Sequence, residues 1–237
     1  MSTSALWSLR AALAAWGTDL ADLVLSRACL ECGRLGRAWC GPCLERHPRL
    51  LQVEQAPDLP PVACAVRYDG AARRALVEYK EYANRALAPM LGALLAEAIA
   101  AHLGQAAVRH AVLVPVPGHR RPARGFDALG AVLTVARRDL AAQHLTVTVV
   151  PAVRLAHDPG PIKAMGRAAR QRAVAGTMRS DGRQARRLAG LGPVRLLVVD
   201  DIVTTGSTAR AAVAALRGTG LAVHGVAAVA RASRAAQ

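Results

Sequence analysis

A stretch near the carboxyl end of the chain constrains the fold most strongly. Residues 194–199 form a mostly apolar strand pattern, two adjacent carboxylates follow at Asp200 and Asp201, and a loop rich in hydroxyl groups then enters an alanine-rich helical pattern. Open α/β sheets bind ligands at the carboxyl ends of their strands, and helix N-termini attract anions. We therefore predict a monophosphate site in which the two carboxylates accept hydrogen bonds from sugar hydroxyls. The predicted phosphate-binding residues are Thr204, Thr205, Gly206, Ser207 and Thr208.

The remaining pattern alternates strands with helices. Strands are predicted at 62–68, 111–116, 145–150, 194–199 and 221–230, and helices at 71–82, 86–103, 127–142 and 207–217. This alternation is typical of an α/β fold with a mostly parallel sheet that helices cover on both faces. We assign that fold to residues 61–237. Residues 1–60 are predicted to form a smaller N-terminal part with an amphipathic helix over 5–25, a cysteine segment, and a proline-containing linker near 54–61.

Four of the five cysteines form two CxxC pairs separated by seven residues: Cys29, Cys32, Cys40 and Cys43. Each pair can present two thiolates to one tetrahedral ion, and the glycines within the segment permit tight turns. We predict a closed, structural zinc site, with iron or a redox disulfide as alternatives. Cys64 lies alone in a predicted strand and is expected to be a small buried residue, whereas His47 is expected at the surface.

The charge of the chain is strongly positive and unevenly distributed. The net charge is +15, from 31 Lys and Arg against 16 Asp and Glu. Residues 1–60 are neutral, and basic side chains crowd between 154 and 187. This predicts an anionic partner, such as nucleic acid or a phosphorylated metabolite, with a solvated basic face as the alternative. We expect neither a signal peptide nor a membrane span, and therefore a cytoplasmic protein.

The stretch 194–208 resembles the signature of the type I phosphoribosyltransferases, in which a hydrophobic strand, two acidic residues and a TTG-type loop hold the ribose and 5′-phosphate of phosphoribosyl pyrophosphate. No Walker A lysine is present, which disfavours an ATPase. The double CxxC, Tyr68-Asp-Gly, Leu76 to Lys80, Val114-Pro-Val-Pro and Arg124-Gly-Phe together resemble the ComF family, which includes GntX-type proteins. The likeness covers nearly the whole chain.

That resemblance implies an enzyme that binds phosphoribosyl pyrophosphate with Mg²⁺ and transfers its phosphoribosyl group to an acceptor that the sequence does not identify. It also implies a link to DNA uptake during natural competence. Asp200 and Asp201 would be catalytic, and the basic segment 154–172 would be a flap that closes over the site. The resemblance also places the pyrophosphate against residues 117–125, the predicted pyrophosphate loop. The implied partners of the pyrophosphate or flap are Lys80, Arg121, Arg124 and Arg170.

The chain also differs from the family pattern. Asp127 and Ala128 stand where two amides are usual, Ile162 and Ala173 align with a glutamine and an asparagine, and Asn84-Arg85 replaces Gly-Asp. Catalysis is therefore a separate question from donor binding. The alternative function is a non-catalytic module that senses the donor and contacts single-stranded DNA or the uptake machinery, which the charge favours and the 3% aromatic content disfavours.

Overall fold

The structure is a computed structural model that describes residues 28–56, 58–106, 108–118, 126–156, 177–192 and 194–232. The chain divides into two compact units, Met1–His47 and Pro48–Gln237. We call the described part of the first, residues 28–47, the cysteine unit and the second the sheet unit. The amphipathic helix predicted over 5–25 lies outside the described residues.

The cysteine unit contains little regular structure. Its described part has one short helix, α2 (Gly41–Glu45), and an isolated antiparallel bridge between Ala28 and Leu35. Gly33 and Gly36 have φ values of 72° and 118°, which side chains of other residues rarely tolerate. These two glycines allow the turn between the cysteine pairs, as the sequence predicted.

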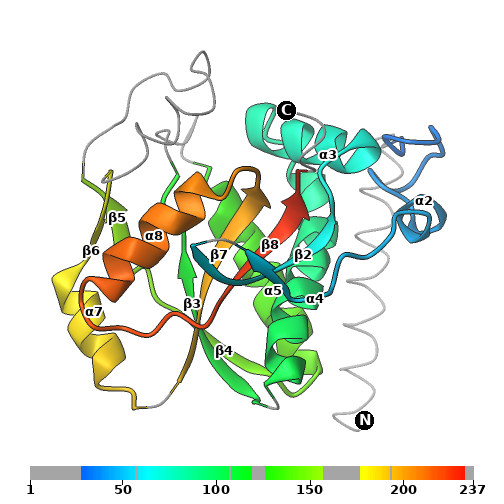
Figure 1. The fold of residues 1–237 in the computed structure, drawn as a ribbon. Coiled ribbons are helices and arrows are strands. Elements are labelled where there is room, and N and C mark those ends of the chain that lie inside the picture. Colours follow the sequence, from blue (N-terminus) through cyan, green and yellow to red (C-terminus); the bar gives the residue numbers. More distant parts are fainter. Residues whose placement is uncertain are drawn as a thin grey trace, which may run out of the picture. The chain divides into compact units, whose positions relative to one another are not determined.

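The sheet unit is built on a six-stranded sheet in the order β1-β2-β8-β7-β3-β4. The five strands from β2 to β4 in that order are parallel, and β1 is antiparallel to β2. Their bounds are β1 (Glu54–Ala56), β2 (Leu59–Arg67), β3 (His110–Pro115), β4 (Thr146–Val149), β7 (Arg195–Val203) and β8 (Gly225–Arg231). The α/β class and the mostly parallel sheet are thus confirmed (Figure 1).

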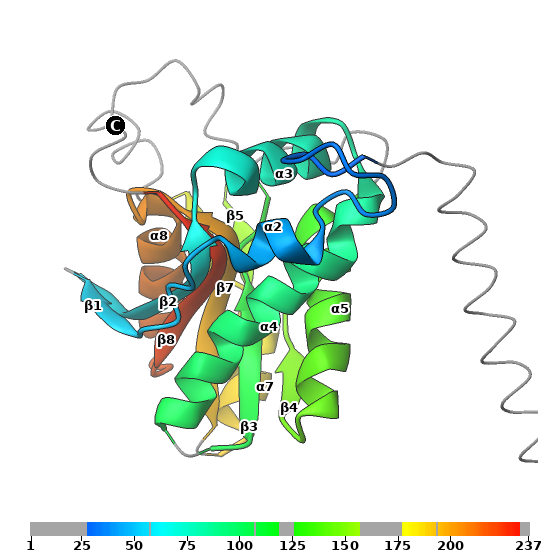
Figure 2. The ribbon, with the colours of Figure 1, turned by 90° about the vertical axis from the view of Figure 1, so that its right-hand side faces the viewer.

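Helices cover both faces of the sheet, because its central strands are apolar on both sides. One face carries α4 (Ala88–Gln105) and α5 (Ala128–Ala142), and the other carries α8 (Ser207–Arg217), as Figure 2 shows. The buried residues of α8 pack with β7 and with Leu188 of α7 (Gly182–Ala189). The helix α3 (Gly70–Glu81) follows β2, and a 3₁₀ turn, η1 (Arg85–Leu87), joins it to α4.

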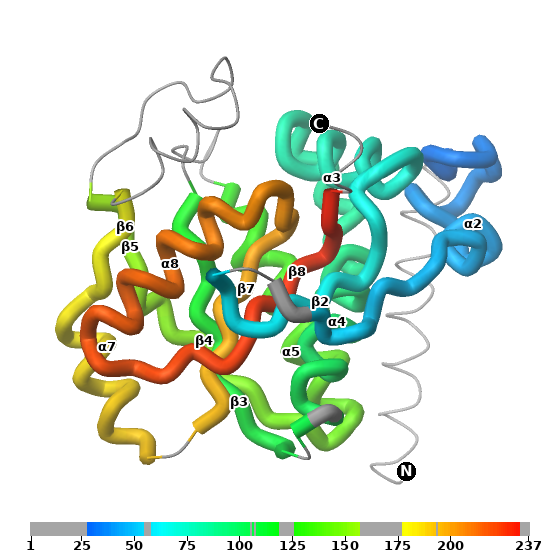
Figure 3. Tube along the Cα trace, viewed as in Figure 1, coloured from blue at the N-terminus to red at the C-terminus, as the bar shows by residue number. Residues whose placement is uncertain are grey.

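The order of connections creates a topological switch point at the carboxyl edge of the sheet. From β3 the chain passes through α5 to β4, whereas from β7 it passes through α8 to β8, on the opposite side. Figure 3 traces these two diverging paths. Neighbouring parallel strands whose connections diverge in this way form a topological switch point, where open α/β sheets bind ligands. The switch point here lies between β3 and β7.

The structure differs from the sequence expectations in several places. Residues 54–61 are not a linker, because β1 and the start of β2 form an antiparallel pair there. The division at His47 also places residues 48–60 with the sheet. Strand β7 continues to Val203, so both aspartates lie within it. Two further features, α7 and a second, two-stranded antiparallel sheet made of β5 (Val153–Leu155) and β6 (Met178–Ser180), were not predicted from the sequence.

One helical stretch in the described residues, Arg85–Gly104, is long and apolar enough to cross a membrane. Its apolar side chains have a different partner, because α4 packs against β2, β8 and α5. Leu94, Leu95, Ile99 and Leu103 are at most 1% exposed. This packing is that of a core helix of the sheet.

Candidate functional site

The loop after β7 has the geometry of an anion cradle. Gly206 has φ 76° and stands at the N-cap of α8, where it has no side chain to cap the helix, and the Ser207 backbone N–H donates a long hydrogen bond of 3.4 Å to Thr205 Oγ1. The hydroxyl groups of Thr205 and Ser207 lie 2.7 Å apart and hydrogen-bond to each other. The first backbone N–H groups of a helix have no partner within it, and the helix dipole is positive at this end. The loop therefore offers hydroxyl and amide donors at the carboxyl edge of the central strand.

Two aspartates and one lysine meet beside this loop. Lys80 Nζ lies 2.7 Å from Asp201 Oδ2, and Asp200 Oδ1 accepts a hydrogen bond of 2.8 Å from the Asp201 backbone N–H. Lys80 lies in the last turn of α3, so two segments about 120 residues apart converge here. The Asp201 side chain is 16% exposed and that of Lys80 40%, so the pair borders on solvent.

The charges of this cluster depend on one another. Burial raises the pKa of the Asp200 carboxyl well above its usual range, and the Asp201 charge adds to the increase, while Lys80 opposes it. Burial lowers the pKa of Lys80, but the charge and hydrogen bond of Asp201 outweigh burial and leave that pKa raised. Lys80 therefore stays charged, and the Asp200 carboxyl binds a proton more readily than an ordinary aspartate does. Such a cluster can accept hydrogen bonds from hydroxyl groups and also hold a proton.

Arg210 fixes the conformation of the cradle, a role that the sequence analysis missed. Its Nη2 donates a hydrogen bond of 2.7 Å to the Thr205 carbonyl. A Cβ on Gly206 would lie 2.9 Å from Leu59 Cδ1 and 3.3 Å from Arg210 Nη1. The positive φ therefore favours glycine at this position, and a Cβ would in addition displace the ends of the Leu59 and Arg210 side chains. The position of Arg210, one turn into the helix after a TTG loop, was the available signal.

An aromatic cluster joins α3 to the chain just before α5. The rings of Tyr79 and Phe126 pack edge to face at 5.3 Å, and the Arg85 guanidinium lies 4.9 Å from the Phe126 ring centre. Tyr79 Oη donates to the Ala128 carbonyl at 2.8 Å. Burial, with the charges of Asp127 and Asp201, raises the pKa of Tyr79 to about 12, so it remains a donor. The cluster fixes one end of the predicted pyrophosphate loop beside the helix that carries Lys80.

Two differences from the family pattern have structural roles here. Asp127 is the N-cap of α5 and accepts a hydrogen bond of 3.0 Å from the Gly130 backbone N–H. Arg85, in place of an acidic residue, is the cation over Phe126. Both residues therefore support the local fold of the segment that follows the predicted pyrophosphate loop.

Several predicted site residues lie outside the described residues. They are Arg121, Arg124 and Arg170. Ile162, Ala173 and most of the predicted flap also lie outside the described residues. Residues 154–156 of the predicted flap are described, and Leu155 lies in β5, opposite Met178 of β6. These two strands form an antiparallel ribbon that packs on α8.

The four predicted metal ligands come together in the cysteine unit. The sulfur atoms of Cys29, Cys32, Cys40 and Cys43 all lie within 4.8 Å of one another, and those of Cys32 and Cys40 are 3.7 Å apart. Tetrahedral zinc with Zn–S bonds of about 2.3 Å places its sulfurs about 3.8 Å apart. The arrangement therefore fits one zinc ion with four protein ligands and no open position. Cys64 is buried in β2, as predicted.

Charged and aromatic side chains surround these thiols. The Glu31 carboxylate accepts hydrogen bonds from Trp39 Nε1 at 3.1 Å and pairs with His47 Nε2 at 3.0 Å. Arg46 Nη2 lies 2.9 Å from Cys43 Sγ and 3.4 Å from Glu31. The hydrogen bond from His47 outweighs burial and, with that from Trp39, lowers the pKa of Glu31. His47 is thus part of the shell around the site and not among its ligands.

The chain matches no family model, and no curated protein has a significantly similar sequence. Its functional interpretation therefore rests on the geometry of the two sites and on the motifs themselves.

Proposed function

We propose that the carboxyl edge of the sheet binds phosphoribosyl pyrophosphate, and that the protein transfers the phosphoribosyl group to an acceptor. The observation that carries this proposal is the arrangement of an anion cradle and a pair of carboxylates on one strand-loop-helix unit at the switch point. The ligand that suits this arrangement has a phosphate on one side of a polyhydroxylated ring. The resemblance to type I phosphoribosyltransferases and to the ComF family supports the same donor.

In this proposal each group has one task. The 5′-phosphate accepts hydrogen bonds from the hydroxyl and backbone N–H groups of Thr204 to Thr208, and the ribose hydroxyls donate to Asp200 and Asp201. Lys80 leaves Asp201 when those hydroxyls arrive and turns toward the pyrophosphate, because its charge stabilises an anionic leaving group. Arg121 and Arg124 complete that side. The flap that contains Arg170 would exclude water from the cation-like sugar of the transition state.

The carboxylate oxygens of Asp200 and Asp201 and the donor's own phosphates are the hard ligands that Mg²⁺ prefers. When bound, this ion would neutralise charge on the pyrophosphate. Zinc has a different proposed role, because a site with four thiolate ligands is closed. It would hold the cysteine unit together and take no part in the transfer.

Calorimetric titration with phosphoribosyl pyrophosphate in the presence of Mg²⁺ tests the donor site. We expect wild type to bind and the double variant Asp200→Asn, Asp201→Asn to lose at least tenfold in affinity, since charge-assisted hydrogen bonds contribute about 1.5–3 kcal/mol each. The double variant Glu45→Gln, Asp139→Asn removes the same charge from α2 and α5 and should bind as wild type does. Absence of binding to folded, zinc-loaded wild type would refute the proposal.

We propose as the second candidate a module that senses the same donor and contacts single-stranded DNA without catalysis. The net charge of +15 favours it, as do the exposed arginines Arg183, Arg186 and Arg187 of α7. The affinity for a labelled oligodeoxynucleotide should then fall steeply with salt, because phosphate contacts release counterions. An affinity that does not change with salt would rule this candidate out, whereas release of pyrophosphate with any acceptor would favour the enzyme.

A further inference from the structure

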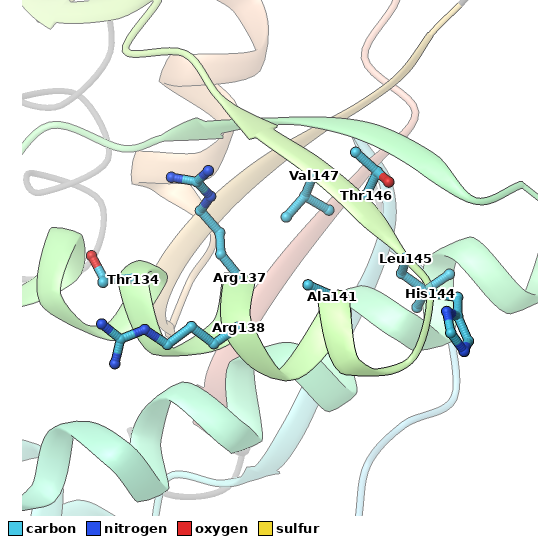
Figure 4. A pocket seen from close by; sticks show the side chains of 8 residues that line it. All are labelled: Thr134, Arg137, Arg138, Ala141, His144, Leu145, Thr146 and Val147. Carbon is cyan, nitrogen blue, oxygen red and sulfur yellow. The ribbon is translucent and has the colours of Figure 1, made fainter. Parts of the chain in front are cut away.

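A basic groove lies between α5 and the edge strand β4, formed by residues that the proposed donor site does not use. The hollow has a volume of about 690 Å³. Figure 4 shows Arg137 and Arg138 from α5 toward one end, His144 at the other, and Ala141 and Val147 between them. The complete lining is Thr134, Arg137, Arg138, Ala141, His144, Leu145, Thr146 and Val147. It contains two guanidinium groups and no carboxylate.

The two arginines have no acidic partner in the described part of the chain. Both side chains are exposed, and neither forms an ion pair with a described aspartate or glutamate, although α5 itself carries Asp139. Consecutive arginines on one helix repel each other, so the site as it stands favours an anion. Guanidinium groups bind carboxylates in a bidentate geometry, which gives direction as well as charge.

The strand beside these arginines has an open edge. β4 is the last strand of the six-stranded sheet, and its pairing in the described residues is with β3 alone. The backbone N–H groups of Thr146 and Val150 donate to carbonyls on the β3 side, those of Arg109 and Leu113. Alternate residues of a strand direct their backbone groups to opposite edges. Val147 and Val149 therefore present their N–H and C=O groups outward, along the groove.

We propose that this groove binds an extended, acidic segment of another protein, which adds to β4 as a further strand and places its carboxylates against Arg137 and Arg138. A strand edge bordered by a helix supplies main-chain hydrogen bonds, and side chains on the helix supply specificity. Every second residue of such a segment faces α5, and these residues carry the carboxylates, while their methylene groups cover the Val147 side chain, which is 7% exposed. Charge complementarity favours an acidic partner, because the charged side chains of the lining are the two arginines, with no carboxylate.

Fluorescence anisotropy with a labelled peptide of about ten residues, alternating valine and glutamate, tests this proposal. We expect the peptide to bind wild type and to lose about tenfold or more in affinity with Arg137→Gln, Arg138→Gln. The double variant Arg73→Gln, Arg74→Gln removes the same charge from consecutive exposed positions on α3 and should bind as wild type does. Equal loss in both double variants would show nonspecific attraction and overturn the proposal.

Val149→Pro tests the strand edge separately. Proline removes the outward N–H group of residue 149 and leaves the bonds between β4 and β3 intact. We expect Val149→Pro to weaken binding of the peptide, whereas Val149→Ala, which keeps the N–H group, should bind it as wild type does. If Val149→Pro does not fold, a peptide N-methylated at alternate residues makes the same test from the ligand side, and unchanged affinity for it would refute strand addition.

Nucleic acid is the competing occupant, and the same variants identify it. The probe is an oligothymidylate of equal charge. If it displaces the peptide, binds Arg137→Gln, Arg138→Gln more weakly and binds Val149→Pro as it binds wild type, the groove is a nucleic-acid surface and the proposal is overturned. A lack of peptide binding to wild type at low salt would overturn it as well.

Discussion

The cysteine unit and the sheet unit are stabilised by different interactions. In the described part of the first, the buried side chains are the thiols of Cys29, Cys40 and Cys43 together with Ala38 and Trp39. In the second, whole strands are buried, and Val198 and Val226 are 0% exposed. A segment with so small a core depends on metal–ligand bonds, whereas a parallel sheet depends on apolar area covered from both sides. Local spacing therefore determines the first unit, and long-range packing determines the second.

Removing one ligand should separate the two units most clearly. Cys43→Ser should abolish zinc binding and unfold the cysteine unit, since structural zinc contributes about 10–16 kcal/mol in small domains. Metal content by mass spectrometry and fluorescence of the buried Trp39 would measure this loss. The melting transition of the sheet unit should remain. Cys64→Ala provides the control, because it removes the fifth thiol and should keep the metal; loss of the sheet transition in Cys43→Ser would show that the units do not fold independently.

A core truncation should have the opposite effect. Leu197 is fully buried in β7 between β8 and β3, so Leu197→Ala should destabilise the sheet unit by about 2–5 kcal/mol. Urea unfolding followed by circular dichroism measures this change, and zinc content should stay at that of wild type. Leu191, which is 45% exposed, provides the control, because Leu191→Ala should change stability by less than about 0.5 kcal/mol. An equal effect of the two would contradict the assigned core.

Glycines distinguish positions that the fold requires from those that it tolerates. Gly206→Ala should destabilise the sheet unit by about 1–2 kcal/mol, because φ 76° is strained for alanine, and should weaken donor binding. Gly104, near the end of α4, has nothing within 4 Å of an added Cβ. Gly104→Ala should therefore stabilise by up to about 1 kcal/mol. Thermal unfolding compares the pair, and a stabilised Gly206→Ala would show that the cradle loop is not held as described.

Acid should destabilise the two units through different groups. The pH dependence of the sheet unit, which involves buried histidines, should be the smallest of these effects. His102 is fully buried in α4, its Nε2 lies 2.9 Å from the Val226 carbonyl, and its Nδ1 has no partner. Burial lowers its pKa below the ordinary 6.5, and the charge of Arg195 adds to this. The unfolded state then binds protons more readily than the folded state. The contribution of His102 to the free energy of unfolding is therefore complete above pH 6.5 and declines below it. Burial and the charge of Arg195 also lower the pKa of His224.

Unfolding titrations at several pH values would measure this decline. His102→Gln, whose amide can still donate to Val226, should show a weaker pH dependence than wild type, whereas His110→Gln at an exposed position should match wild type. The cysteine unit should instead lose its metal in acid, because its ligands are thiolates. Identical pH profiles for wild type and His102→Gln would exclude His102 as the responsible group.

Sequence patterns predicted the parts whose signal is local. The spacing of Cys29, Cys32, Cys40 and Cys43 predicted their cluster, and the alternation after residue 61 predicted a mostly parallel sheet. The string from Asp200 to Thr208 predicted a loop at a carboxyl edge that leads into a helix. The linker predicted near 54–61 was wrong: three prolines suggested an irregular segment, yet β2 tolerates Pro60 and Pro61 where it pairs with the short β1.

What the sequence by itself determined about this protein is the fold class, the cysteine cluster and the strand-loop-helix unit, because each depends on residues a few positions apart. The tertiary structure alone decided that Lys80 meets Asp201, that Arg85 and Tyr79 contact Phe126, and that β4 is an edge strand beside two arginines. Those facts depend on strand order and on helix packing between segments tens to more than a hundred residues apart. Sequence periodicity carries no information on which strand lies next to which, since burial favours every apolar strand equally.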